Sequence, residues 1–420
     1  DQASASALPG LGLNIVRYNA GGSSYALANG ESMKVSPNIE GSRQVFGFWQ
    51  DWESSDPSSG SWNWSASVDA NQISMLVKAQ ERGSDLLELF SNSPMWWMCG
   101  NHNPSGADSG SSDNLEEWNQ RNHTVYLANV AAHARDEWGV NFDFVEAFNE
   151  PVSDWWDSEG TQEGCHFDTS TQEIVAEYLR EELDAKGLFD VIVAASDENT
   201  YDEARSTWNS FDESTQAQIG KVNVHGYQQG NGRRDLLYDD VGGTRLWNSE
   251  YGDGDATGLS LAANLNLDFV WLHNTAWVYW QVLDGGGWGL LQSDENTVPV
   301  VVGETNMKFF VMAHYTRHIR PGSTILTVEG GSDSVVAYDP SSRKLVIVAV
   351  TYHGARWMVH DLSEFASVGG PVNRWVTATD GSGDQYAEFS GDVAVSSSGQ
   401  ISVYFPSKTI MTFEIDNVII

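Results

Sequence analysis

The order of apolar segments constrains the fold of this chain most strongly. From its start to about residue 320, short β-branched or apolar runs alternate with segments of helical periodicity. This alternation predicts a parallel sheet, because parallel strands need a crossover between them. The predicted strands are Leu13–Asn19, Asp85–Asn92, Phe142–Glu150, Val191–Ser196, Lys221–Tyr227, Arg245–Glu250 and Thr275–Val282. The clearest predicted helices are Ile73–Arg82, Glu116–Trp138, Thr169–Lys186, Leu259–His273 and Asn306–Ile319.

A closed barrel of alternating strands and helices has eight strands, one more than this pattern contains. We therefore predict an α/β fold, a (β/α)8 TIM barrel over residues 1–320, whose first strand-plus-helix unit would precede Asp1. From about Pro321 the helical periodicity ends, and short strand patterns follow one another across Gly, Ser and Asp turns. This texture predicts an antiparallel β-sandwich side domain over residues 321–420. Its predicted strands are Ser323–Val328, Ser334–Tyr338, Lys344–Tyr352, Arg374–Thr379, Val393–Ser396, Gln400–Phe405 and Thr409–Ile415.

The charge of the chain limits its partners. Asp and Glu number 58 against 22 Lys and Arg, which gives a formal net charge of -36. Such a surface repels nucleic-acid phosphates and anionic lipids, so we exclude both as partners. No apolar run approaches the roughly 20 residues of a membrane helix. We expect a monomer that binds a neutral polysaccharide or oligosaccharide.

Several sparse features favour secretion. The chain begins with Asp1 rather than Met and has no apolar leader, as a processed chain would. The triplets that begin at Asn63 and Asn122 are candidate glycosylation sites. Cys99 and Cys165 are too few for a metal cluster and are a candidate disulfide pair.

Two strands end in a glutamate, Glu150 in Phe148-Asn-Glu-Pro and Glu250 in Asn248-Ser-Glu-Tyr-Gly. The carboxyl ends of barrel strands build the active site of this fold. Because side chains alternate along a strand, Leu246, Asn248 and Glu250 are expected to share one face. Cleavage of a glycosidic bond requires two such carboxyl groups, one that carries a proton and one that is charged. The alternatives are two solvated strand ends, or Glu146 in place of Glu150.

Three other polar residues have positions that suit this site. Arg17 lies within an apolar strand and would keep Glu250 ionised, unless it forms a surface ion pair instead. His225 and Tyr227 share a face at the end of another strand. Either would hydrogen-bond a carboxylate or a sugar hydroxyl, although a histidine satisfied in the core is the alternative.

Tryptophans follow several strand ends, and 18 of them are present in the chain. Sugars stack their C–H faces on aromatic rings, and exposed aromatic rings on loops are costly unless they bind something. We predict substrate contacts for Trp97, Trp155, Trp280 and Trp288, with Trp280 as the floor for the cleaved sugar. Burial in the core is the alternative for each of them.

Other motifs indicate no metal and no cofactor. The segment Gly252-Asp-Gly-Asp-Ala-Thr-Gly has the composition of a calcium loop but lacks the spacing and the terminal Glu. Gly285-Gly-Gly is not followed by the Lys of a phosphate loop. Zinc-protease, Cys-x-x-Cys and Gly-x-Ser-x-Gly motifs do not occur, which excludes the usual protease, redox and serine-hydrolase chemistries.

Longer motifs resemble a known family. They include Gly12-Leu-Asn-Ile-Val-Arg-Tyr-Asn-Ala-Gly-Gly, Asn92-Ser-Pro-Met-Trp-Trp-Met, Thr161-Gln-Glu-Gly-Cys-His-Phe, Ser196-Asp-Glu-Asn-Thr-Tyr and Tyr279-Trp-Gln-Val-Leu-Asp-Gly-Gly-Gly-Trp-Gly. Together with the two glutamate motifs, they resemble glycoside hydrolase family 30, and within it the fungal endo-β-1,6-galactanases.

The resemblance implies a retaining hydrolase with Glu150 as acid/base and Glu250 as nucleophile, while Asn149 holds the sugar 2-hydroxyl. It also implies β-1,6-linked galactan as substrate, cut internally. A β-1,6-glucanase or xylanase of the same family, and a catalytically inactive carbohydrate-binding protein, are the alternatives.

Overall fold

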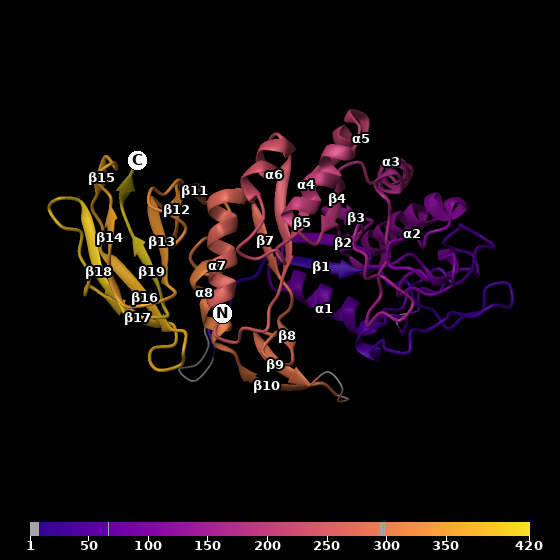
Figure 1. Cartoon of the computed structure of the whole chain (residues 1–420), viewed down its shortest axis with the longest axis horizontal. Coiled ribbons are helices and arrows are strands. Elements are labelled where there is room, and N and C mark those ends of the chain that lie inside the picture. Colours follow the sequence, from indigo (N-terminus) through magenta and orange to yellow (C-terminus); the bar gives the residue numbers. More distant parts are fainter. Residues whose placement is uncertain (1–7, 66, 295–296, 298) are drawn as a thin grey trace. The chain divides into compact units, whose positions relative to one another are not determined.

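The computed structural model describes residues 8–65, 67–294, 297 and 299–420 (Figure 1). The chain forms two compact units. The first, here called the barrel unit, comprises Asn14–Glu250 and Asn274–Val278. The second, here called the sandwich unit, comprises Asp1–Leu13, Tyr251–His273 and Tyr279–Ile420.

A seven-stranded sheet forms the centre of the barrel unit, with its strands in sequence order. Each of the first five strands pairs in parallel with the next. The predicted α/β barrel-type sheet is therefore confirmed, and every predicted strand of this part overlaps an observed one. The strands are β1 (Ile15–Asn19), β2 (Leu86–Phe90), β3 (Phe144–Glu146), β4 (Ile192–Glu198), β5 (Ile219–His225), β6 (Arg245–Tyr251) and β7 (Ala276–Tyr279).

Helices separate these strands along the chain. Three of them were not predicted, because α4, α5 and α6 are short. Local signals for two of these helices exist, since Thr200 and Asp212 accept hydrogen bonds from Glu203 N and Thr215 N as N-caps. The helices of the barrel unit are α1 (Ala70–Glu81), α2 (Gln120–His133), α3 (Thr169–Ala185), α4 (Tyr201–Ser210), α5 (Glu213–Gln218) and α6 (Arg234–Val241). A π-helical turn over Ala134–Trp138 and 3-10 turns over Gly41–Arg43, Trp96–Met98 and Glu117–Asn119 complete this list.

An apolar layer fills one level of the barrel interior. Phe144 of β3, Trp247 of β6 and Ala276 of β7 pack together, with Ile15, Leu86 and Ile192 against them. The ammonium of Lys221 on β5 lies 3.9 Å and 3.7 Å from the ring centroids of Phe144 and Trp247. Lys221 thus connects this apolar layer with the charged side chains of the site.

Residues 321–420, all of them described, form strands and no helix, as predicted. A six-stranded antiparallel sheet has the order β11-β12-β13-β19-β16-β17, and β14 pairs with β18 (Figure 1). Earlier in the sandwich unit lie α7 (Leu259–Leu267), α8 (Met307–Thr316) and a small sheet of β8 (Leu283–Asp284), β9 (Leu291–Asp294) and β10 (Val301–Thr305). The later strands are β11 (Thr324–Leu326), β12 (Ser334–Asp339), β13 (Lys344–Thr351), β14 (Arg356–Asp361), β15 (Ser367–Val368), β16 (Val372–Ala378), β17 (Ala387–Ser390), β18 (Gln400–Phe405), β19 (Thr409–Ile415) and β20 (Val418–Ile419).

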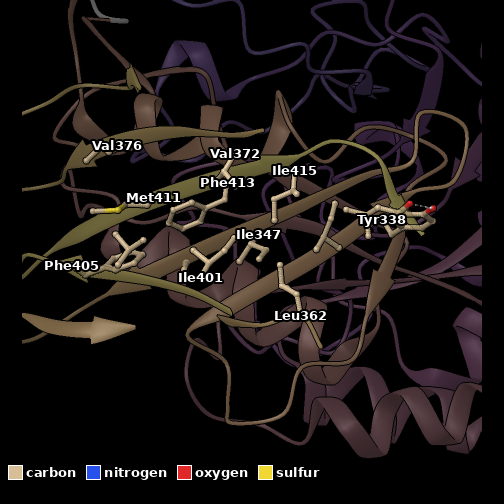
Figure 2. Packing of buried hydrophobic residues seen from close by; sticks show 14 residues of the cluster. Tyr338, Ile347, Leu362, Val372, Val376, Ile401, Phe405, Met411, Phe413 and Ile415 are labelled. Atoms are coloured by element: carbon tan, nitrogen blue, oxygen red, sulfur yellow. Dashed lines mark hydrogen bonds between the residues drawn. The ribbon is translucent and has the colours of Figure 1, made fainter. Parts of the chain in front are cut away.

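The core of these strands is apolar (Figure 2). On β18, Ile401, Val403 and Phe405 are buried while the residues between them are not, which is the alternation of a strand with one covered face. They join Phe413 of β19 and Ile347 of β13 in one cluster. This arrangement is a sandwich, in which two sheets bury their facing sides.

One predicted strand is wrong. Val393–Ser396 has no strand pairing, although Val393 and Val395 pack against the core. These two valines hold a loop, not a strand, against the core. The strands β14, β15, β17 and β20, and the earlier strands β8, β9 and β10, were not predicted. The domain boundary near residue 320 stays a prediction.

Among the described helices, none combines the length and the apolar character that crossing a membrane requires.

Candidate active site

Glu150 lies in the segment that follows β3 and has an unusual backbone. Its φ angle is +50°, a left-handed conformation that costs a residue other than glycine about 1 kcal/mol. Two hydrogen bonds hold it there: Glu150 N donates to Asp197 O at 2.8 Å, and Trp156 Nε1 donates to Glu150 O at 2.9 Å. Strained residues that their surroundings fix in this way cluster at functional sites.

Glu250 reaches the site through an irregularity in β6. The expected alternation would leave Ser249 on the opposite face, yet the Ser249 hydroxyl donates to Asp197 Oδ1 at 2.5 Å, beside Glu250. The register between β5 and β6 shifts between Val224 and His225, so that His225 pairs with Glu250. The predicted shared face of Leu246, Asn248 and Glu250 is therefore wrong. A local bulge re-aims side chains at this strand end.

The two glutamates lie close together. A carboxylate oxygen of Glu150, one of Glu250 and a ring nitrogen of His225 are all within 4.8 Å of one another. The side chains of Glu150 and Glu250 are 9% and 12% exposed. A retaining glycosidase has its carboxyl groups about 5–5.5 Å apart, and an inverting one has them more than about 6.5 Å apart. The 4.8 Å limit on one oxygen of each carboxyl group lies below the gap of about 6.5 Å that an inverting pair needs, which favours the retaining class.

Each glutamate has its own hydrogen-bond donors. Arg17 Nη1 donates to Glu250 Oε2 at 3.1 Å, and the Tyr227 hydroxyl donates to Glu250 Oε1 at 2.9 Å. Glu150 Oε1 accepts from Asn199 Nδ2 at 2.7 Å and lies 2.9 Å from His225 Nδ1. Asn199 was not predicted, although it follows β4 as Glu150 follows β3.

Asp197 is the second residue that sequence reasoning missed. It is fully buried, has a φ angle of +64° and forms an ion pair with Arg17 Nη2. Its Oδ1 lies 3.2 Å from His225 Nε2. Burial disfavours its ionisation, but the charges of Arg17 and His225 outweigh burial and hold its pKa below the usual range. Asp197 thus orients a cation beside each glutamate.

The charge state of His225 follows from its two neighbours. Burial disfavours the imidazolium, yet Asp197 and Glu250 raise its pKa well above that of an ordinary histidine. With both ring nitrogens facing carboxylates, His225 is a charged donor. Both neighbours favour the imidazolium over the neutral imidazole that binds a metal, although Glu150, His225 and Glu250 offer ligand atoms within 4.8 Å of one another.

The expected depression of the Glu250 pKa is wrong. Burial raises the pKa of Glu250 above the usual value, and Glu150 and Asp197 add to this. His225 and Arg17 lower it without cancelling the effect of burial.

Further inside the barrel lies a layer of charged and amide side chains. Lys221 forms a buried ion pair with Glu88, and Asn223 Nδ2 donates to Glu88 Oε1 at 2.6 Å. Glu146, the rival of Glu150, is fully buried in this layer. Burial, Asp197 and Glu88 raise the pKa of Glu146 well above that of a free glutamate, so it is neutral. A neutral acid out of contact with solvent is a poor partner for a sugar.

The four predicted tryptophan platforms differ in exposure. Trp97 is 1% exposed, and its Nε1 donates to Trp49 O at 2.9 Å. It packs edge-on against the Trp49 ring, so its predicted contact with sugar is corrected to a core role. Trp155 is 45% exposed after β3, and Trp288 is 39% exposed in the sandwich unit. Trp280 directly follows β7 and is partly buried.

The remaining candidate residues have the following places. Asn149 is buried next to Glu150. Cys99 and Cys165 are free, buried thiols, so the structure contains no bridge between them. Asn63 is exposed, whereas Asn122 is partly buried in α2 and its amide donates to Asn119 Oδ1 at 2.9 Å.

A second cluster with metal-binding side chains joins Asp113, His166 and Asp168. Both oxygens of Asp113 already accept hydrogen bonds, from Asp168 N at 2.5 Å and from the Thr171 hydroxyl at 2.6 Å. These contacts place a carboxylate at the N-terminus of α3, which is its ordinary structural use.

Comparisons with known proteins agree with this geometry. A family model described as O-glycosyl hydrolase family 30 matches residues 1–221. The endo-β-1,6-galactanase of Hypocrea rufa is 55% identical over 418 residues, which cover 98% of this chain and 85% of that protein.

Two solved structures share the fold. A conserved exported protein from Bacteroides fragilis has a TM-score of 0.78 and 17% identity, over 98% of this chain and 90% of that one. The catalytic domain of the family 30 xylanase C from Talaromyces cellulolyticus has a TM-score of 0.69 and 18% identity, over 97% and 89% of the two chains.

A barrel sheet with a pair of close carboxyl groups at its strand ends defines a glycoside hydrolase. This chain belongs to glycoside hydrolase family 30.

Proposed function

We propose that the chain is an endo-β-1,6-galactanase that hydrolyses the β-1,6-linked galactan of arabinogalactan side chains with retention of configuration. The observation that carries this proposal is the pair Glu150 and Glu250, close together and held by different donors. The 55% identity to the Hypocrea rufa enzyme supports galactan rather than another β-linked glycan.

In the proposed mechanism, Glu250 attacks the anomeric carbon while Glu150 protonates the departing oxygen. Glu150 then activates a water molecule that releases the sugar from Glu250. Arg17 and Tyr227 orient the attacking carboxylate through their hydrogen bonds. Asn149 and the tryptophans Trp155, Trp280 and Trp288 are proposed to bind the sugar. The proposed chemistry uses side chains of the chain itself.

Glu250 attacks only when it is charged. Activity is therefore expected to fall as pH drops through the Glu250 pKa, which burial places above that of a free glutamate.

Product analysis tests the proposed function. The purified protein would be incubated in parallel with β-1,6-galactan, β-1,6-glucan and glucuronoxylan, with Glu150→Gln and Glu250→Gln as matched inactive controls. A ladder of galacto-oligosaccharides at early times is the expected result. Faster cleavage of glucan or xylan would move the chain to another specificity of the family, and a single small product would indicate exo action. Binding to galactan without cleavage would leave a carbohydrate-binding protein.

Secretion and a monomeric state are further parts of the proposal. A polymer too large to enter a cell requires an enzyme outside it, and an exposed Asn63 suits glycosylation. Mass spectrometry of the protein from culture medium and light scattering in solution test these two points.

A further inference from the structure

The calcium-like segment Gly252–Gly258, here called the acidic loop, holds a buried ammonium. Lys308 is the second residue of α8, and its side chain is 0% exposed. Its Nζ donates to Asp253 O at 2.7 Å, to Asp253 Oδ1 at 3.0 Å and to the Tyr279 hydroxyl at 2.8 Å. These three acceptors match the three protons of an ammonium group.

The glycines of the acidic loop serve close packing around this ammonium. A Cβ atom on Gly252 would lie 2.2 Å from Trp280 O, and one on Gly258 would lie 2.7 Å from Lys308 Cα. Asp255 instead accepts hydrogen bonds from the backbone of Thr257 and Ser260, where α7 begins. The acidic loop, whose composition resembles that of a calcium site, therefore surrounds the ammonium group of Lys308.

The ammonium joins three segments that matter for the proposed reaction. The acidic loop begins two residues after Glu250 in the chain. Tyr279 ends β7 and precedes Trp280, and its hydroxyl donates to Trp288 O at 2.5 Å. Lys308 Nζ also lies 3.5 Å from Trp288 O. One buried ammonium thus contacts both Trp288 O and the side chain of the residue that precedes Trp280.

Burying an ammonium group in this space costs free energy. Burial disfavours the charged form and lowers the pKa of Lys308, although Asp253 and Asp255 oppose this shift. A buried ion pair is often no more stable than apolar residues of the same volume. The charge is then better explained by the geometry it imposes than by stability.

We propose that Lys308 is a positioning residue for the sugar: its ammonium acts as a built-in cation that orients the acidic loop and the backbone of Trp280 and Trp288. This proposal rests on the proposed function, in which those two tryptophans contact the substrate. Lys308 itself does not touch the reacting atoms.

Chemical rescue tests the proposal. Lys308→Ala removes a fragment that n-propylammonium matches in size and charge. In this variant we expect kcat/KM on β-1,6-galactan to fall about tenfold or more, mainly through KM, since misplaced groups lower productive binding. Propylammonium at tens of millimolar should restore part of this loss, while tetramethylammonium or sodium chloride at the same ionic strength should not. The absence of selective rescue would overturn the proposal.

A readout without substrate separates this proposal from the proposed function. Intrinsic tryptophan fluorescence and the melting temperature of Lys308→Ala should return toward wild-type values with propylammonium. If the wild-type protein does not cleave β-1,6-galactan, the proposed function is wrong. The rescue of fluorescence and melting temperature would still test the role of the cation. A variant that folds only with propylammonium supports the proposal, and one that fails to fold even with it contradicts the proposal.

Two further variants sharpen the test. Tyr279→Phe keeps the cation and its direct contact with Trp288 O but removes the second link through the Tyr279 hydroxyl, so KM should rise less than in Lys308→Ala. Lys308→Met fills the same space without charge. Wild-type KM and fluorescence in Lys308→Met would show that packing alone positions the loop, and would refute the proposal.

Discussion

The interior of the barrel unit and the core of the sandwich unit differ in the polarity of their buried side chains. Beside the active site lie buried ionisable and amide side chains, and Arg17 Nε, Glu146 Oε1 and Asn223 Oδ1 have no hydrogen-bond partner among the described residues. The sandwich core consists of apolar side chains and Tyr338, whose hydroxyl donates to Val418 O at 3.0 Å (Figure 2). The barrel interior gives up stability to keep reactive groups charged and aimed, whereas the sandwich core contributes stability alone.

The largest expected effect is on activity and comes from the barrel. Glu250→Gln should lower kcat by at least about 10³-fold, because it removes the nucleophile. Its melting temperature should not fall, since a neutral amide replaces a carboxylate whose pKa burial already raises. Glu146→Gln is the matched control and should retain activity within about tenfold, because Glu146 is already neutral. Steady-state kinetics and calorimetry measure both, and equal losses in the two variants would contradict the assignment.

The next effect is on stability and comes from the sandwich. Phe413→Ala should lower the free energy of unfolding by about 3–5 kcal/mol, because Phe413 is fully buried in the apolar cluster. Denaturant unfolding measures this change. The variant should keep wild-type kcat at temperatures where it is folded. Lost kcat in the folded variant would show that the two regions are not separable as described.

The pH dependence of stability should differ in sign between the two regions. Burial raises the pKa of Glu163 in the barrel unit to about 7. Its contribution is complete below the pKa of an unfolded glutamate and is lost as pH rises through 7. Between pH 5 and pH 8 the free energy of unfolding should therefore fall by about 3 kcal/mol from this residue. Glu163→Gln should remove this part of the slope, as melting temperatures across that pH range would report.

Glu414 in the sandwich unit provides the opposite case. Burial opposes its ionisation, but hydrogen bonds and charges from His318 and Lys344 outweigh burial, so its pKa is lowered. Its contribution is present above the pKa of an unfolded glutamate and is lost as pH falls through the folded value. Glu414→Gln should therefore weaken the loss of stability in acid. A steeper slope for either variant would contradict these signs.

The smallest effect concerns one hydrogen bond. Tyr338→Phe removes the donor to Val418 O and should cost about 1 kcal/mol of unfolding free energy, with activity unchanged. Chemical denaturation measures it. A cost as large as that of Phe413→Ala would mean that the sandwich core depends on its polar contact more than on packing.

The sequence allowed the two glutamates to be predicted because each lies at the end of an apolar segment, and strand ends of a barrel converge, although β3 itself ends four residues before Glu150. It also placed Arg17, His225 and Tyr227 near them by the same argument. It did not indicate Asp197 or Asn199 as partners, because their contacts depend on a left-handed residue and on a register shift in β5 and β6. The pattern of apolar residues predicts neither feature.

Aromatic residues were the least predictable part of the site. Trp97 follows a strand end as Trp155 does, yet it is buried against Trp49, whose ring also stacks on Trp62. Buried tryptophans and exposed, sugar-binding tryptophans give the same sequence pattern in a loop. Only the conformation of the loop distinguishes them. The short helices α4 and α6 escaped detection for a similar reason, since helices of two to three turns carry little periodicity.

The stereochemistry of the first product tests the central claim most directly, namely that Glu150 and Glu250 form a retaining pair. Proton NMR of a fresh digest of β-1,6-galactan follows the anomeric signals before mutarotation. The account predicts that the β-anomer appears first and that the α-anomer grows in later. Initial release of the α-anomer would contradict it, because inversion requires the two carboxyl groups to lie further apart than they do here.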